Sequence, residues 1–349
     1  MAGRSRSVWT LAALQAAVTL SWMAYGYHQP RLLAQFGFET LSGILAWYLA
    51  LAGTTLAPLA GDASDRLVRS GGDRFPIVRA GVFLAGASFV AVAVTAAAQG
   101  DSVLRWVLPL FVALWIAGMT VFQAPALAIV RDVTAPGEVS SAMVPVLLAT
   151  TVPIACWPLV EALLQHLGGS ATFLSGGVAV VGTALALGRT TAVARDRPPA
   201  PAPESPRGLR AFACGMASAV VVLLATDRVP AALAPVSGIG ASWLATIAML
   251  AASASAALTA RAGGRIPSGP ALVGGVVVAF VGLAAARVVV GTGGAVVVAV
   301  VTGAGLGLHL GTALPFLLDR ASSARAGLAT GLYVGGAMLG ARLVQVLVA

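Results

Sequence analysis

The segment GDASDRLVRSGGDRFP, residues 61–76, is a charged turn between two long apolar runs at residues 40–60 and 76–98. Each run has about the twenty residues that an α-helix needs to cross the hydrocarbon core of a bilayer. Such a cluster of acidic and basic side chains is too costly to place in hydrocarbon. The segment therefore predicts two membrane spans joined by a short turn in water.

The alternation of apolar runs and short charged gaps continues along the whole chain. Hydrophobic residues make up 58% of the 349 positions and charged residues only 9%, and the mean hydropathy is +0.93. A soluble domain carries about 25% charged residues. The composition therefore excludes most soluble enzyme classes and predicts an all-α, polytopic membrane helix bundle.

Eleven apolar runs are long enough to span a bilayer. They lie near residues 8–27, 40–60, 76–98, 103–124, 140–164, 171–188, 211–233, 240–260, 270–286, 289–316 and 326–347. The charged, proline-rich stretch RTTAVARDRPPAPAPESPRGLR interrupts them after the sixth run and reads as a linker. We therefore expect an N-terminal six-helix bundle at residues 1–188, a cytoplasmic linker at 189–210 and a C-terminal five-helix bundle at 211–349.

Arginine sets the expected orientation, because the chain contains no lysine and its net charge of +9 comes from 21 arginines. Sixteen of the 21 fall on the same side as the N-terminus when the eleven runs are threaded back and forth. Cytoplasmic loops are enriched in basic residues. We therefore expect a multi-pass protein of the inner (plasma) membrane with a cytoplasmic N-terminus. Topology then explains the charge, and nucleic acid is not expected as a partner.

The two halves show a weak internal repeat. YHQPRLLAQFG from Tyr27 matches DRVPAALAPVSG from Asp227 at an offset of 200 residues, and PALAIVRD at Pro125 resembles PFLLDR at Pro315 at an offset of 190. Such repeats predict two pseudo-symmetric halves with a cavity at their interface. By this offset a twelfth span is missing. Either the chain is a shortened natural variant or a partner helix or subunit covers the gap.

The segment 61–76 resembles the G-x-x-x-D-R-x-x-x-x-G-x-x-R-x-P loop of the major facilitator superfamily. Its Arg-x-Pro ending is most similar to the glycoside-pentoside-hexuronide cation symporters, the sucrose-type transporters and the bacteriochlorophyll-delivery branch. The resemblance implies the two-half fold of that superfamily and transport by alternating access. The matching loop of the second half, ARAGGRIPSGP, keeps arginines but lacks the aspartate.

Charged residues beside this loop are candidates for a cytoplasmic gate. Asp65 can hold a neighbouring helix N-terminus or an arginine such as Arg131, and Gly61 lets two helices approach closely. Arg131-Asp132 resembles a second charge cluster of the superfamily, with Asp319-Arg320 as its counterpart. The candidate gate comprises Gly61, Asp65, Arg66, Arg69, Arg74, Arg131, Asp132, Asp319 and Arg320. The alternative is a set of topology anchors and solvated ion pairs that contribute little.

Matched polar groups in the first and seventh runs are candidates for substrate contact. The repeat pairs Tyr27 and His28 with Asp227 and Arg228. We expect these four side chains to face each other near the outer mouth of the cavity, as substrate contacts or as an extracellular gate. Alternatively, Asp227 and Arg228 pair with one another in a loop.

Other polar groups inside apolar runs are functional candidates because hydrocarbon disfavours them. Glu161 and His309 suit proton or cation coupling, although Glu161 lies near a helix end and His309 could bond a carbonyl between packed helices. Gln15 and Gln123 suit a hydroxyl-rich substrate or helix contacts. Arg342 faces either the cavity, where it would favour an anionic group, or the interface.

Together these features predict a secondary active transporter for an unidentified small molecule, with protons or Na⁺ as candidate coupling ions. The sequence has no GxxxxGK[ST] loop for ATP, no HExxH, no GxSxG, and no CxxC beside Cys156 or Cys214. We therefore expect neither an enzyme nor a bound metal or cofactor. The alternative is a non-transporting relative for pigment or lipid delivery or complex assembly. A cavity containing Asp227, Arg228 or Glu161 favours transport, and a lipid-open apolar groove favours delivery.

Overall fold

Helices are the only regular elements in the residues that the computed structural model describes, which are 2–97, 103–135, 137–192, 208–263 and 268–348. The short elements are η1 (Val103–Val107), η2 (Leu224–Arg228) and η4 (Ser323–Arg325). The α-helices are α1 (Ala2–Gln35), α2 (Leu41–Arg69), α3 (Phe75–Ala97), α4 (Leu108–Val133), α5 (Val139–Ala142), α6 (Val144–Ala155), α7 (Trp157–Ala192), α8 (Gly208–Leu223), α9 (Val229–Ser237), α10 (Ala241–Ala262), α11 (Ser268–Ala285), α12 (Thr292–Arg320) and α13 (Ala326–Val348). This confirms the all-α polytopic bundle.

The described residues form ten helical stretches that are long and apolar enough to cross a membrane, and a shorter apolar helix at Val139–Ala155. The shorter helix belongs to the fifth predicted span, which is broken. Pro153 lies inside α6, which continues through it to Ala155. The next proline, Pro158 at the start of α7, lacks the N–H that would continue α6. The first part of α7 then extends this span as far as Gly168, whose left-handed backbone (φ 72°) bends α7.

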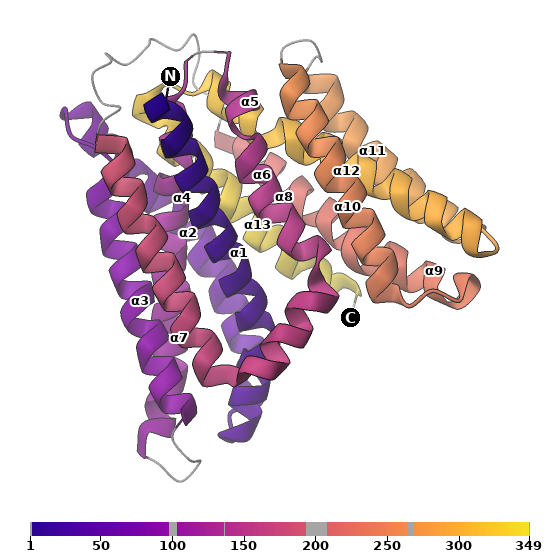
Figure 1. The fold of residues 1–349 in the computed structure, drawn as a ribbon, viewed down its shortest axis with the longest axis horizontal. Helices are drawn as coiled ribbons and strands as arrows, with labels where there is room; N and C mark the ends of the chain where they lie inside the picture. Colours follow the sequence, from indigo (N-terminus) through magenta and orange to yellow (C-terminus); the bar gives the residue numbers. More distant parts are fainter. Residues whose placement is uncertain (1, 98–102, 136, 193–207, 264–267, 349) are drawn as a thin grey trace.

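The helices form two groups that converge at the face carrying the N-terminus and diverge toward the opposite face (Figure 1). The groups meet where α2 packs on α13 and where α6 packs on α10. Each pair joins the second span of one half to the fifth span of the other. That pattern is what a two-fold relation between the halves produces. Most of the predicted linker lies at residues 193–207, outside the described residues.

Small residues let α2 and α13 approach closely. A Cβ on Gly61 would clash with the carbonyl of Gly327, and a Cβ on Gly335 would lie 2.7 Å from the carbonyl oxygen of Gly53. Gly331 faces Ala57 between these two pairs. The helices are therefore antiparallel, with a small residue at every fourth position of each contact face. In lipid, such stripes are what allow helices to pack tightly.

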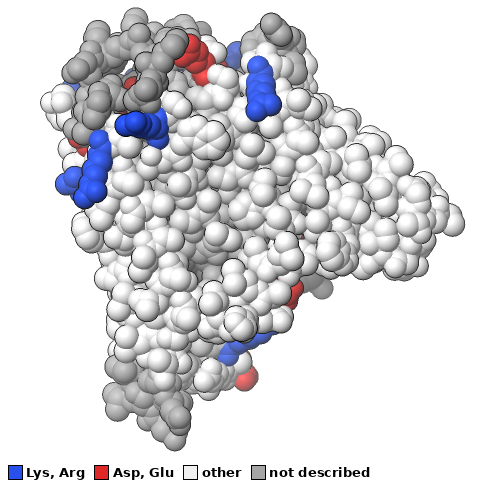
Figure 2. Space-filling view, viewed as in Figure 1, with Lys and Arg blue, Asp and Glu red and all other residues white. Residues whose placement is uncertain are grey.

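Charge is distributed unevenly over the surface (Figure 2). Arginines gather at the face that carries the N-terminus, and a broad uncharged band covers the middle of the molecule. The C-terminal end of α13 lies toward the opposite face (Figure 1). We refer below to the face with the N-terminus as the N-face.

Candidate functional site

A cavity of about 390 Å³ lies between the two halves. Helices α1, α2, α4 and α6 of the first half and α12 and α13 of the second line it. Its wall is mostly leucine, valine, methionine and alanine. The polar and aromatic groups in the wall are Gln15, Trp22, Gln123, Thr150, Thr151 and Tyr333.

Two carboxamides of this wall lack a protein partner. The Nε2 of Gln15 and the Oε1 of Gln123 are both buried without a hydrogen bond. A buried polar atom without a partner costs about 1–3 kcal/mol, so such atoms usually mark a ligand or water site. One atom donates and the other accepts. The cavity can therefore bind a neutral group that both accepts and donates hydrogen bonds.

The N-face end of the molecule is closed by a clasp, which we define as the first-half residues Asp65, Arg69, Arg74 and Arg131 holding the α12–α13 turn of the second half. Asp65 is fully buried and accepts hydrogen bonds from the backbone N–H groups of Gly327 (2.9 Å) and Leu328 (2.8 Å). These are first-turn amides of α13, where the helix dipole favours a carboxylate. The clasp thus fixes the start of α13.

Arg74 is the centre of the clasp. Its guanidinium donates to Asp65 (2.5 Å), Ser64 (2.9 Å) and Asp132 (2.8 Å), and also to the carbonyl of Ser323 in the second half. Burial alone would lower the pKa of Arg74, but the carboxylates of Asp132 and Asp65 outweigh it and raise that pKa. The arginine is therefore permanently charged inside the protein, fully partnered by two carboxylates.

Arg131 and Arg69 hold the same turn from two further positions. Arg131 is buried and donates to the carbonyl of Ala321 at 3.1 Å, which caps the C-terminal end of α12. Arg69 donates to the carbonyl of Ala324 at 2.8 Å. Asp65 therefore pairs with Arg74 and not with Arg131, because Arg131 reaches past it to the end of α12.

The remaining candidate gate residues lie around the clasp. Arg66 binds Asp62 on its own helix at 2.7 Å and is exposed. Arg320 stacks on the ring of Phe316 at 3.8 Å. Asp319 has one buried carboxylate oxygen without a hydrogen bond, near Arg131. Arg66 and Arg320 thus contact their own helices and do not bridge the halves.

The structure does not bring Tyr27, His28, Asp227 and Arg228 together. Tyr27 packs on Leu164 of α7 inside the first half, and His28 lies against Tyr27 and Phe173. Asp227 and Arg228 pair with each other at 3.1 Å, and Asp227 is exposed while Arg228 is half-buried. Their π-helical turn η2 packs on helices of the second half. None of the four lines the central cavity.

The other ionisable candidates also lie outside the cavity wall. Glu161 is half-buried in the first part of α7. His309 is fully buried and bonded to Ser218 and to the carbonyl of Leu272. Arg342 lies over the ring of Trp47 at 5.0 Å, between α13 and α2. Of the predicted substrate or coupling residues, Gln15 and Gln123 are therefore the two in the cavity wall.

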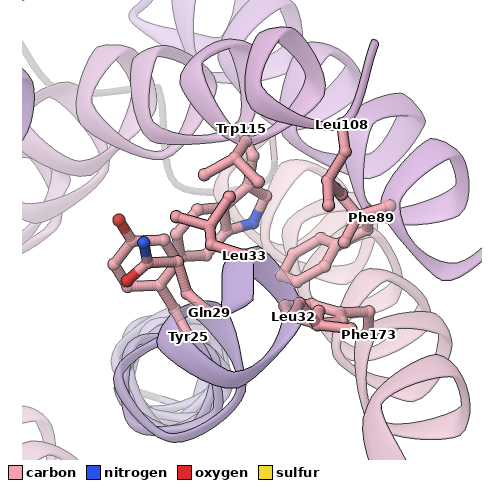
Figure 3. Close-up of a pocket in the computed structure, with 10 residues that line it drawn as sticks. Tyr25, Gln29, Leu32, Leu33, Phe89, Leu108, Trp115 and Phe173 are labelled. Atoms are coloured by element: carbon pink, nitrogen blue, oxygen red, sulfur yellow. The ribbon is translucent and has the colours of Figure 1, made fainter. Parts of the chain in front are cut away.

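A second, much smaller cavity of about 10 Å³ lies inside the first half. Figure 3 shows Tyr25 and Gln29 on one side of it and Phe89 and Phe173 on the other. A volume of this size holds about one water molecule, so it cannot be a substrate site. Trp115 stacks on Tyr25 with ring centroids 4.8 Å apart, and the aromatic cluster ties α1, α3, α4 and α7 together.

Sequence reasoning missed several residues of the site. In α2 and α13, small residues recur with three residues between them, as in the small-xxx-small motifs of packed membrane helices, so these stripes are visible in the sequence. The hydroxyls of Ser64, Ser218 and Tyr333 give no such signal. Which way a serine or tyrosine points depends on the rotation of its helix, and apolar runs on all sides of a span do not encode that rotation.

Solved structures resemble this chain in fold. A bacterial homologue of the iron transporter ferroportin, in an outward-facing state, matches with a TM-score of 0.71 and 13% identity over 97% of this chain and 91% of that one. FucP, a major facilitator superfamily transporter in the outward conformation, matches with a TM-score of 0.59 and 13% identity over 98% and 92%. No protein-family model matches the sequence, and no curated protein matches it.

The chain is thus a multi-pass membrane protein with the fold of the major facilitator superfamily. Both of these structures are of transporters, not enzymes. At 13% identity the likeness extends to the fold and not to a branch of the superfamily.

Proposed function

We propose that this protein is a secondary transporter that moves a small, neutral, mostly apolar molecule by alternating access. The observation that carries the proposal is the cavity of about 390 Å³ between the halves, with the free donor of Gln15 and the free acceptor of Gln123 in its wall. Substrate sites between the repeats of a transporter occupy this position. An apolar wall with a few placed polar groups is typical of small-molecule sites.

The membrane orientation follows from charge. The N-face holds the clustered arginines (Figure 2), and the positive-inside rule assigns such a face to the cytoplasm. The clasp then closes the cytoplasmic end of the cavity, and the structure is an outward-facing form in the inner membrane. Opening would require the α12–α13 turn to leave Asp65 and Arg74.

The proposed substrate class follows from the chemistry of the wall. Among the described residues, those that line the cavity include no aspartate, glutamate, arginine or histidine. The described part of the chain has no group of three or more His, Cys, Asp or Glu that could hold a metal ion. The proposed substrate is therefore not a metal ion. Protons or Na⁺ are the candidate coupling ions.

Delivery of a pigment or lipid, the alternative drawn from the sequence, would need a groove open to lipid. The cavity is instead lined by six helices drawn from both halves. This position between the halves favours a transported molecule.

The test is a thermal-shift screen of the purified full-length chain against neutral sugars, amphipathic alcohols and amides, organic anions and Fe²⁺. We expect stabilisation by a neutral compound, and about fivefold weaker binding of it by Gln15→Leu and by Gln123→Leu, because a lost hydrogen bond costs about 1 kcal/mol. Gln29→Leu is the matched control, since Gln29 bonds Ser42 away from this cavity. Stabilisation by Fe²⁺ or anions alone, or unchanged binding in both cavity variants, refutes the assignment.

A further inference from the structure

His309 lies at a junction of four helices in the second half. It is fully buried in α12. Its Nδ1 lies 3.0 Å from the carbonyl of Leu272 in α11, and its Nε2 lies 2.9 Å from the hydroxyl of Ser218 in α8. The phenol of Tyr333 in α13 donates to the same hydroxyl at 3.0 Å. Tyr333 also lines the central cavity.

The hydrogen atoms of this cluster can be assigned from its acceptors. A carbonyl oxygen only accepts, so Nδ1 carries a proton and Nε2 of the neutral ring is an acceptor. Ser218 has one proton and two acceptors within reach, Nε2 of His309 and the carbonyl of Cys214, each at 2.9 Å. In the neutral state that proton must point at Nε2.

The same heavy atoms also satisfy a protonated ring. With a proton on Nε2, His309 donates to Ser218, and Ser218 turns its own proton to the carbonyl of Cys214. Tyr333 continues to donate to Ser218 in both states, because the oxygen of a hydroxyl has two lone pairs. A structural histidine needs only one of these arrangements. Here the cluster accommodates both without moving a heavy atom.

We propose that Tyr333, Ser218 and His309 form a proton-binding relay that connects the central cavity to a buried site. In one concerted step, a hydronium ion in the cavity gives a proton to the phenol oxygen of Tyr333 and becomes water, Tyr333 passes its own proton to Ser218, and Ser218 passes its own to Nε2 of His309. Each oxygen gains one proton and loses one, so one proton moves from the cavity to the imidazole. The ligand of this site is the proton itself.

The surroundings of His309 contain no competing charge. The ring is acted on by the backbone of Leu272 and of Cys214, and no charged side chain of the described residues acts on it. The titratable groups of the same cluster are the phenol of Tyr333 and the thiol of Cys214, which acts on that phenol. A proton on His309 is therefore the single charge of this junction. Tyr333 connects this cluster to α13. The clasp holds the first turn of the same helix. A role for this relay in coupling proton movement to transport rests on the proposed function. Proton binding by His309 does not.

The test is a pH titration of the purified full-length chain in nanodiscs with ¹⁵N-labelled histidine. The chain has three histidines, so His309→Gln assigns the signal. We expect Nε2 of His309 to bind a proton reversibly within the pH range over which the protein stays folded. Ser218→Ala should shift the midpoint by about one pH unit, a tenfold change in proton affinity. Ser218→Thr, which keeps the hydroxyl, should preserve it.

Tyr333→Phe tests the path between the cavity and His309, because it removes the phenol hydroxyl and leaves Ser218 and His309 in place. It should slow proton exchange of His309 with solvent and leave the midpoint nearly unchanged. Ser253→Ala is the matched control, since Ser253 is a buried serine that bonds Thr151 between α10 and α6. A ring that stays neutral across this range, or equal behaviour of Ser218→Ala and Ser253→Ala, overturns the proposal. This titration needs no substrate, so its outcome is independent of the thermal-shift screen.

Discussion

Asp65→Asn is the most direct test of the clasp. The substitution keeps the shape of the side chain and removes its charge. In the closed form Asp65 contacts Arg74 in its own half and the amides of Gly327 and Leu328 in the other. The Arg74 contact lies within the first half and persists whether the N-face is open or closed. The two amide contacts exist only in the closed form and therefore set the effect on the equilibrium.

The magnitude follows from these two contacts. A hydrogen bond to a charged group contributes roughly 1.5–3 kcal/mol, and a neutral one about 1 kcal/mol. Asparagine has one acceptor oxygen, so it can keep one neutral bond of the two charged ones. The closed form then loses about 2–5 kcal/mol relative to the open form, a shift of roughly 30- to 4,000-fold in their ratio.

Spin labels across the N-face measure this ratio. Ser70, which follows α2, and Arg210 in α8 are exposed on opposite halves and can each be replaced by a labelled cysteine. This requires a background in which Cys156 and Cys214 are alanine. Double electron–electron resonance should show a short distance in the parent protein and a longer, newly populated distance in Asp65→Asn.

Asp62→Asn is the matched control. Asp62 lies one turn before Asp65 but pairs with Arg66 and Arg69 of its own helix, and these pairs are exposed. Exposed ion pairs contribute about 0–1 kcal/mol, so this variant should leave the distances almost unchanged. If Asp65→Asn keeps the parent distances, or if both variants open the N-face equally, the clasp does not hold the closed form as argued.

Three further predictions follow. Gly331→Ala should lower the unfolding temperature, because its Cβ would clash with the backbone of Ala57 and overpacking costs about 1–3 kcal/mol; Gly26→Ala, with open space at its Cβ, should not. Arg74→Lys should lower that temperature more than Arg66→Lys, because one ammonium cannot reach all the acceptors around Arg74; equal shifts would contradict this. Reporter fusions should place the two termini on opposite sides of the membrane, and the same side for both would contradict an odd number of spans.

Most of the fold could be predicted because lipid restricts the chain so strongly. A span must satisfy its backbone internally and must be about twenty residues long, so apolar runs locate the helices. The break in the fifth span is the main departure. Pro158 and Gly168 mark it in the sequence, but a membrane helix can also bend at a proline and continue, as α6 does at Pro153. The outcome depends on the neighbouring helices.

The candidate site was less predictable, because residues at matched positions of the two halves do not have to lie close together. The predicted repeat matches Tyr27 to Asp227, yet residues related by a two-fold axis meet only if they lie close to that axis. The contacts between halves instead join non-equivalent spans, the second of one half with the fifth of the other. Gln15 and Gln123 were found as polar groups within apolar runs, but that signal alone did not distinguish them from Glu161, which lies elsewhere.

The composition of the clasp explains why the second half has no matching acidic motif. The first half supplies the charged side chains, and the second half supplies main-chain groups: the carbonyls of Ala321, Ser323 and Ala324 and the first amides of α13. Every residue has these groups, so the turn needs only the right shape and a helix end on each side. A search for paired charges therefore finds one half of the clasp and misses the other. Closure then depends on the docking of the backbone of the α12–α13 turn. Single substitutions in that turn should therefore leave closure largely intact, except at the glycines that pack against α2.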